Sequence, residues 1–201
     1  MESTKLTFSI FNSLEKKLKT KLERLNIKRD AFVEHLLSIE LEHLAETMKN
    51  KKNHPKAKTL INQKMDKKRK TTPLTIVVSK ALANRMYQLM KQHNISRDAF
   101  INRLFIFLLL EDAHLSRLGI PTHSSDIEAF INLVDRAPTS PLAALEYWLD
   151  DPLYFIREHL LAHGEYMYLT DLDALQNGLT VMTSCYLDNT EQYEVPEDLV
   201  F

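Results

Sequence analysis

The sequence has few of the residues that build disulfide-bonded, zinc-binding or glycine-rich folds. Among its 201 residues there is one cysteine, Cys185, and there are three glycines. A single cysteine excludes an intrachain disulfide and every zinc motif that needs several cysteines, and it is typical of a reducing compartment. Scarce glycine, together with runs of Leu, Lys, Glu and Ala, favours a mainly helical protein.

A long apolar run is also missing. The most apolar window, residues 100–110, is shorter than the roughly 20 residues that a membrane-spanning helix needs, and it contains Arg103. No apolar stretch follows the first residues, so no secretory signal is visible. We therefore expect a cytoplasmic protein with no membrane contact, and we interpret residues 100–110 as a buried helix.

The net charge of −1 hides a strong asymmetry along the chain. Residues 1–119 contain 24 Lys and Arg against 12 Asp and Glu, whereas residues 120–201 contain 2 against 15. A segment with excess positive charge is typical of phosphate binding, and an acidic segment would be repelled by nucleic acid. The two parts are expected to face different partners.

One segment of the sequence occurs twice, with a spacing of 68 residues. Residues 6–41 reappear without a gap as residues 74–109. Each copy begins with alternating apolar and polar residues and then changes to helical spacing, which predicts one strand followed by two helices. Because a lone strand cannot satisfy its own backbone groups, we expect the two strands to pair with each other. The identical pairs are Leu6/Leu74, Thr7/Thr75, Leu14/Leu82, Asn26/Asn94, Ile27/Ile95, Arg29/Arg97, Asp30/Asp98, Ala31/Ala99, Phe32/Phe100, Leu36/Leu104 and Leu41/Leu109.

In the first copy we expect a strand over residues 5–11 and then a helix capped by Asn12 or Ser13. The apolar face of that helix would comprise Leu14, Leu18, Leu22 and Leu25, and the helix would end near Asn26. Asn tolerates the left-handed conformation that closes many helices, and Asn94 occupies the same place in the second copy.

The second helix of each copy has a different surface. In the first copy it is expected over residues 28–48, with Glu34, Glu40, Glu42 and Glu46 facing solvent. In the second copy it is expected over residues 96–118 and is apolar almost all round, with Ile106, Leu108 and Leu110 in place of polar residues. We therefore expect the C-terminal segment to cover this helix, docking on the second copy and not on the first.

The chain divides into four segments. Residues 1–48 and 73–119 are the two repeats, and residues 49–72 form a basic linker with ten Lys and Arg and one acidic residue. The linker is expected to be solvated, with a short helix after Pro55. Residues 120–201 are expected to form a small, acidic, mostly helical domain, with helices over 126–136 and 141–162, a break at 150–152, and a strand over 179–186.

Each repeat resembles a ribbon-helix-helix module of the MetJ/Arc/CopG type. The resemblance lies in Leu-Thr-Phe-Ser-Ile (6–10), Leu-Thr-Ile-Val-Val (74–78), and the turn sequence Asn-Ile-Lys/Ser-Arg-Asp-Ala-Phe at 26–32 and 94–100. It implies a mainly α fold in which the tandem repeats form a single-chain pseudo-dimer, with one antiparallel two-stranded ribbon and four helices. It also implies a transcriptional regulator that binds double-stranded DNA sequence-specifically. Tandem copies are similar to the TraY-type accessory proteins of conjugative plasmids.

Strand side chains alternate, so one face of the ribbon is predicted to be buried and the other to meet the bases in the major groove. The buried set is expected to be Leu6, Phe8, Ile10, Leu74, Ile76 and Val78. The candidates for base readout are Lys5, Thr7, Ser9, Pro73, Thr75 and Val77. Because Pro73 donates no hydrogen bond, the two strands are unequal readers, and we expect a DNA site without strict two-fold symmetry. The alternative is that this face is only the solvated side of an edge ribbon.

The start of each second helix offers backbone N–H groups and a positive dipole end to a DNA phosphate. The candidates there are Lys28, Arg29, Ser96 and Arg97; Ser96 is expected to cap its helix, whereas Lys28 cannot. The alternative is that both arginines are ordinary solvated charges. Asp30 and Asp98 are expected to stabilise the helix starts. A second candidate group either binds phosphates along the DNA backbone or stays mobile; it comprises Lys67, Lys68, Arg69 and Lys70.

No catalytic, cofactor or metal site is predicted. His159 and His163 have a spacing compatible with a metal, but they are better explained as the end of a helix before Gly164. Asp150-Asp151 and the pair Asp171/Asp173 lack an accompanying base or nucleophile. The aromatic residues near them, Tyr147, Trp148, Tyr154, Phe155, Tyr166 and Tyr168, are expected to form a small core.

Three other readings stay open. The acidic C-terminal domain could bind a basic protein partner, as an antitoxin does, or could fold back on the basic repeats as an autoinhibitor. The protein could also be an architectural or relaxosome accessory protein that binds DNA for assembly. Whether two copies of the chain associate further is open as well.

Overall fold

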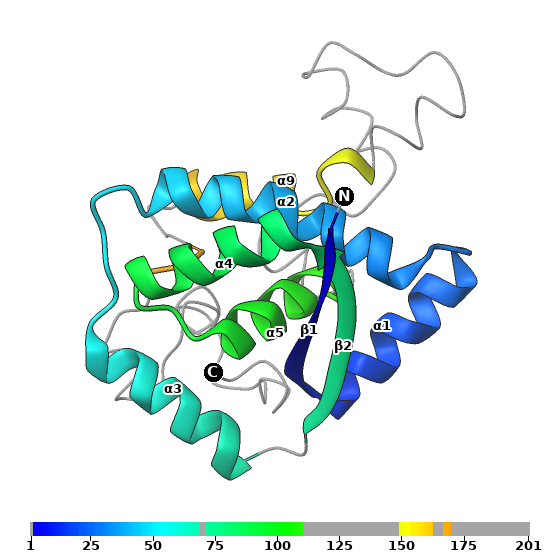
Figure 1. The fold of residues 1–201 in the computed structure, drawn as a ribbon, viewed down its shortest axis with the longest axis horizontal. Coiled ribbons are helices and arrows are strands. Elements are labelled where there is room, and N and C mark those ends of the chain that lie inside the picture. Colours follow the sequence, from blue (N-terminus) through cyan, green and yellow to red (C-terminus); the bar gives the residue numbers. More distant parts are fainter. Residues whose placement is uncertain (1, 69–70, 111–148, 163–166, 170–201) are drawn as a thin grey trace, which may run out of the picture. The chain divides into compact units, whose positions relative to one another are not determined.

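The computed structural model describes residues 2–68, 71–110, 149–162 and 167–169 (Figure 1). Contacts divide the chain into two units, residues 1–109 with 166–201, and residues 110–165. The protein is mainly helical and contains a two-stranded antiparallel sheet, as the sequence predicted. Both strands and five helices lie in the first unit, and so does the candidate site.

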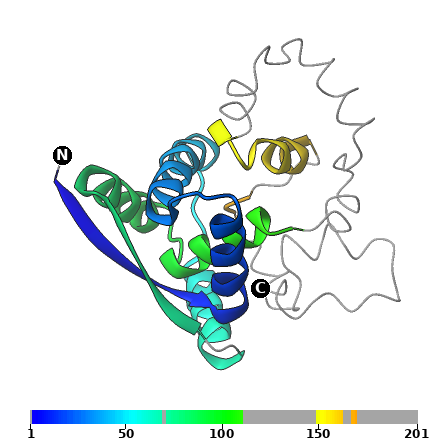
Figure 2. The same cartoon turned by 90° about the vertical axis from the view of Figure 1, so that its right-hand side faces the viewer.

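The sheet is formed by β1 (Ser3–Phe11) and β2 (Thr71–Ser79), which pair with Thr7 opposite Thr75. The expected pairing of the two repeats' strands is therefore confirmed. One face is buried through Phe8, Ile10, Leu74, Ile76 and Val78, and Leu6, which was expected to be buried, is partly exposed. In Figure 2 the helices of this unit lie on one side of the ribbon. The other face is left to solvent.

Each strand runs directly into a helix, α1 (Asn12–Arg24) after β1 and α4 (Lys80–Gln92) after β2. No loop separates β1 from α1, so the N-cap position falls on Phe11 and the expected cap by Asn12 or Ser13 is wrong. The Asn12 side chain instead accepts a hydrogen bond from the Thr72 hydroxyl. Ser79 caps α4, accepting from the Leu82 N–H at 3.4 Å.

The turns after α1 and α4 close in the same way. Asn26 has a φ of 57° and Asn94 a φ of 56°, so the predicted left-handed closure is confirmed. The Ile27 N–H donates to the Leu22 carbonyl at 2.9 Å, the six-residue bond of a Schellman motif. Leu25, which was expected on the apolar face, is 58% exposed because it lies at the C-cap of α1.

The second helices are α2 (Arg29–Thr47), which packs on β2 and α4, and α5 (Arg97–Leu108), which packs on β1 and α1. The helix expected over residues 96–118 is thus too long. Its end lies at Leu108, where the next N–H donates to both the Phe105 and Ile106 carbonyls. Such bifurcated bonding is typical of a terminating last turn.

The linker is more ordered than its composition suggested. The helix predicted after Pro55 is confirmed as α3 (Pro55–Lys68), but Asn53 and Ala57 are buried, so the linker is not simply solvated. The Asn53 N–H donates to the His93 carbonyl at 3.0 Å, and the Asn94 side chain donates to the Asn53 carbonyl at 3.2 Å. These bonds fix the linker to the turn between α4 and α5.

A short C-terminal segment, residues 167–169, packs into the same unit. The Tyr168 side chain is 2% exposed, its ring centroid lies 5.7 Å from that of Phe100, and its hydroxyl bonds the Glu40 carboxylate. Glu40, expected on the solvent face of its helix, is therefore buried. Because Tyr168 contacts both repeats, the expectation that the C-terminal segment docks on the second repeat alone is also wrong.

Two side chains bind the backbone of this segment. The Arg103 guanidinium donates to the Met167 carbonyl at 2.6 Å, and the Asn53 side chain donates to the Tyr168 carbonyl at 3.1 Å. Burial lowers the pKa of Arg103 to about 10, so the side chain is still a cation at neutral pH. The positive charge needs an acceptor there, and the carbonyl supplies one.

In the second unit the described residues are 110 and 149–162. The helix α9 (Tyr154–Ala162) follows a break at 151–153, close to the predicted interruption, and the buried Arg157 pairs with Asp151. The helix expected over 126–136 and the strand expected over 179–186 lie outside the described residues. Within the described part of the chain, no helix is long and apolar enough to span a membrane.

Candidate nucleic-acid interface

The six residues predicted to read bases lie together on the exposed face of the ribbon. They form three cross-strand pairs, and Val77, the most apolar of them, is 40% exposed. None of the described helices α1 to α5 covers this face (Figure 2). It offers one amine, three hydroxyls and two apolar groups to a partner; the pairs are Lys5 with Val77, Thr7 with Thr75, and Ser9 with Pro73.

The register places one pair of equivalent residues, Thr7 and Thr75, opposite each other. Thr7 and Thr75 are 68 positions apart, and their hydroxyl oxygens lie 2.9 Å apart at the centre of the ribbon. The flanking positions are not equivalent, because Lys5 corresponds to Pro73 and Ser9 to Val77. The face is therefore symmetric in backbone and asymmetric in chemistry.

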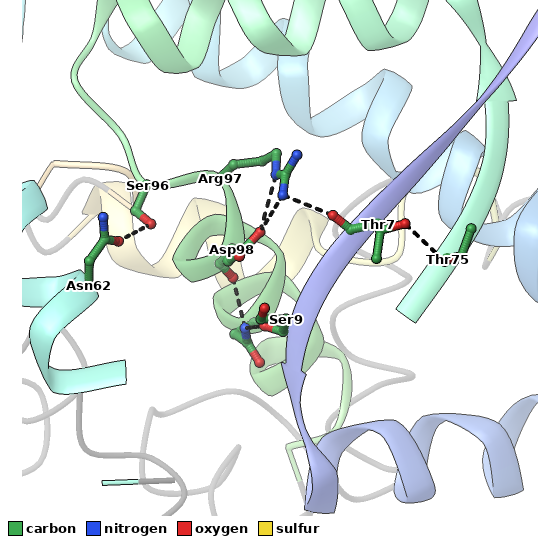
Figure 3. A network of polar contacts seen from close by, with 8 residues as sticks. Thr7, Ser9, Asn62, Thr75, Ser96, Arg97 and Asp98 are labelled. Atoms are coloured by element: carbon green, nitrogen blue, oxygen red, sulfur yellow. Dashed lines mark hydrogen bonds and ion pairs between the residues drawn. The ribbon is translucent and has the colours of Figure 1, made fainter. Parts of the chain in front are cut away.

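The arginines at the starts of α2 and α5 each reach the strand of the other repeat. Arg29 Nη2 donates to the Thr75 carbonyl at 2.9 Å. Arg97 Nη2 donates to the Thr7 carbonyl at 2.8 Å, as Figure 3 shows. The Arg97 guanidinium also lies 5.1 Å from the centroid of the Phe8 ring. The sequence analysis considered these arginines as phosphate contacts or as ordinary solvated charges. Their role in bracing the ribbon was missed, although their identical placement in both repeats was the available signal.

Both arginines remain partly accessible. The Arg29 side chain is 42% exposed and the Arg97 side chain 47% exposed, and each also pairs with the aspartate that follows it. A guanidinium has five N–H donors, so a carbonyl and a carboxylate do not exhaust its capacity. Both remain candidates for phosphate contact.

Polar side chains of α2 and α5 satisfy the outer edges of the ribbon. On the β2 edge, Asp30 Oδ2 accepts from the Val77 N–H at 3.1 Å and Glu34 Oε1 accepts from the Ser79 N–H at 2.7 Å. Asp30, expected only to stabilise its helix, therefore also binds the ribbon. Such cover prevents an exposed strand edge from pairing with another chain.

On the β1 edge this role belongs to Asn102. Its Oδ1 accepts from the Phe11 N–H at 3.0 Å, and its Nδ2 donates to the Ser9 carbonyl at 2.8 Å and to the Asp98 carbonyl at 2.8 Å. Asn102 corresponds to Glu34 in the repeat alignment. The sequence analysis did not assign either residue to the strand edges. The available signal was that both repeats have a polar residue at this position, and on α5 its neighbours are mostly apolar.

The residues directly before the arginines differ. Lys28 is exposed at the N-cap of α2 and makes no side-chain cap, as expected. Ser96 is buried at the N-cap of α5, but its hydroxyl donates to Asn62 Oδ1 of α3 at 2.6 Å and does not cap the helix (Figure 3). The cap predicted for Ser96 is therefore wrong, because the linker helix takes its hydroxyl.

The remaining candidates lie at or beyond the limit of what is described. Lys67 and Lys68 are the last residues of α3, and the positions of their side chains are not described; Arg69 and Lys70 lie outside the described residues. Their assignment to phosphates stays a prediction. His163 is also outside, and the described residues contain no group of three His, Cys, Asp or Glu that could hold a metal.

Comparisons of the chain with family models, with curated proteins and with solved structures found no match.

Proposed function

We propose that the protein is a sequence-specific DNA-binding transcriptional regulator whose two repeats act as a single-chain ribbon-helix-helix pseudo-dimer. The observation that carries the proposal is the exposed ribbon face centred on Thr7 and Thr75. Arg29 and Arg97 bind its backbone carbonyls, and side chains of α2 and α5 bind the backbone of both outer strand edges. Because Arg29 and Arg97 hold the backbone of the two central residues, the threonine hydroxyls are presented in a fixed arrangement.

The dimensions and chemistry of the face suit the major groove. Two strands lie about 4.8 Å apart, and a groove about 12 Å wide admits a two-stranded ribbon. Lysine donates to guanine, threonine hydroxyls contact several bases, and Val77 offers an apolar surface to a thymine methyl group. The inequality of Lys5 with Pro73 supports a DNA site whose two halves differ.

The experiment that tests the proposal is selection from random duplex DNA by the full-length protein. The variant carries Lys5→Ala, Thr7→Ala and Thr75→Ala together, and the control carries Lys16→Ala, Thr20→Ala and Lys21→Ala on the exposed side of α1. Since single base contacts contribute about 1–3 kcal/mol, we expect the ribbon variant to bind the selected site about tenfold to hundredfold more weakly. The control, which loses more charge, should select the same motif.

Failure of this experiment has a clear form. Thermal melting first establishes that both variants fold. If the wild type enriches no motif, or if the ribbon variant enriches the same motif as the wild type with equal affinity, base readout by the ribbon is refuted. A selected site that is a perfect palindrome would refute the predicted inequality of the two strands.

A second prediction concerns the phosphate contact at the start of α2. Lys28 is exposed and is not a helix cap, so Lys28→Ala should weaken binding equally for all DNA sequences. The slope of log affinity against log salt concentration should become shallower by about 0.9, the value for one phosphate contact. Titrations at several salt concentrations measure this, with Lys16→Ala as the control. An unchanged slope would remove Lys28 from the interface.

A further inference from the structure

The linker helix makes the two flanks of the ribbon unequal. On the flank of the second repeat, the Ser96 hydroxyl bonds Asn62 of α3, and the buried Ala57 fixes the start of the same helix. His93, in the turn before α5, is buried and bonds the Lys51 carbonyl through Nδ1 at 2.8 Å. The residue equivalent to His93 in the first repeat is Leu25, which is 58% exposed. No linker segment covers that turn.

The second-repeat flank contains a cleft of about 750 Å³ between α3, α4 and the start of α5. Its basic residues are Lys58 of α3, Lys91 of α4 and Arg97 of α5. Among the described lining residues the acidic one is Asp98, which is already paired with Arg97. The cleft is therefore cationic.

The cleft opens beside the exposed face of the ribbon. Ser9 of β1 and Thr71 of β2 belong to its lining, and Ser9 is also one of the candidates for base readout. Arg97 belongs to both regions, since it braces Thr7 and also lines the cleft. Any polyanion lying along the ribbon on this side would meet the cleft next.

The equivalent surface of the first repeat lacks the basic pair formed by Lys58 and Lys91. The position of Lys91 is occupied there by Glu23, which is exposed on α1 beside Lys19. The linker precedes the second repeat, and in the described part of the chain the first repeat has no helix in the place of α3. The difference between the flanks is thus built into the chain order.

We propose that this cleft binds the DNA sugar-phosphate backbone beside the ribbon, adding to the contacts at the helix starts a further phosphate contact on the second-repeat flank. This inference rests on the proposed function and extends it. Lysine and arginine side chains in a groove release condensed counterions when they neutralise phosphates, which adds affinity and salt dependence without sequence information. Bound DNA should therefore be protected further on the side of the second repeat.

Hydroxyl-radical footprinting of the full-length protein on its selected site tests this. The variant is Lys58→Ala with Lys91→Ala, and the control on the opposite flank is Lys19→Ala with Lys21→Ala. We expect the wild type and the control to protect an extra stretch of backbone on one side only. The Lys58/Lys91 variant should lose that stretch, keep the central protection, and show a salt slope shallower by about 1.8, the value for two phosphate contacts.

The outcomes separate this inference from the proposed function. Central protection with equal flanks, or a one-sided extension that survives in the Lys58/Lys91 variant, would overturn the flank contact and leave ribbon readout intact. Binding that needs neither the ribbon residues nor a selected site would overturn the proposed function and the flank contact with it. Thermal melting of the variant excludes loss of the fold as the cause.

Discussion

Replacing Tyr168 with Ala is expected to lower the free energy of unfolding of the first unit by about 3–5 kcal/mol, the range for deleting a large aromatic side chain from a core. The tyrosine ring is buried beside Phe100, and its hydroxyl bonds the buried Glu40 carboxylate. Alanine would leave a cavity and remove that bond. Chemical denaturation of the full-length protein, followed by circular dichroism, measures the loss.

The hydroxyl can be tested separately from the ring. Tyr168→Phe keeps the packing and removes the donor to Glu40, so we expect a loss of about 1–3 kcal/mol, the cost of removing one hydrogen bond to a buried charged group. Tyr87, which is 69% exposed, supplies the matched control: Tyr87→Ala and Tyr87→Phe should each change stability by less than about 0.5 kcal/mol. If Tyr168→Ala is as mild as Tyr87→Ala, the segment is not docked as described.

The docking of residues 167–169 on the repeats affects how the protein should be divided for experiments. Residues 1–119 contain both repeats, but they lack Met167 and Tyr168, whose backbone carbonyls accept from Arg103 and Asn53. Fragment 1–119 is therefore expected to be less stable than the full-length protein. Lower stability would obscure any gain in DNA affinity caused by removing an autoinhibitory domain. Point variants in the full-length chain avoid this ambiguity.

Asn102→Leu is the second substitution with a large expected effect, about 2–4 kcal/mol in the free energy of unfolding. Asn102 is fully buried and makes three hydrogen bonds, two of them to the edge of β1. Leucine has a similar volume, so the packing is largely kept while the polar groups of the edge lose these partners. Each buried group that loses its partner costs about 1–3 kcal/mol.

The equivalent position provides the comparison for this variant. Glu34→Gln retains a carbonyl oxygen that can accept from the Ser79 N–H, so its effect should be below about 1 kcal/mol. Amide hydrogen exchange gives a local readout, because the Phe11 N–H should lose protection in Asn102→Leu and keep it in Glu34→Gln. Full protection of Phe11 in Asn102→Leu would show that the edge does not depend on this side chain.

The local elements of the fold could be predicted from the sequence because the signals for them are local. Alternation gave the two strands, helical spacing gave the helices, and Asn26 and Asn94 marked the turns whose left-handed geometry the structure contains. The duplication added the pairing, since each unpaired strand had one obvious partner. The exposed face of the ribbon followed from the same alternation.

The interactions that could not be predicted join positions far apart in the chain. The bond between Glu40 and Tyr168 spans 128 residues, and nothing near Glu40 distinguishes it from the exposed glutamates of the same helix. From the sequence, the Ser96 hydroxyl is expected to cap a helix, but in the structure it donates to Asn62, 34 residues away in the chain. In both cases a tertiary partner outcompeted the local preference on which the sequence argument relied.

On the proposed function, the pairing of β1 with β2 within one chain also determines how the DNA-reading surface can change over generations. In an assembly of two identical chains, every substitution appears twice, so both ends of a recognised sequence must be revised together. Here Ser9 and Val77 occupy the same place in the two repeats and are encoded separately. A single mutation therefore alters one end of the surface and spares the other, and each end can acquire a new preference without passing through a state in which both are lost.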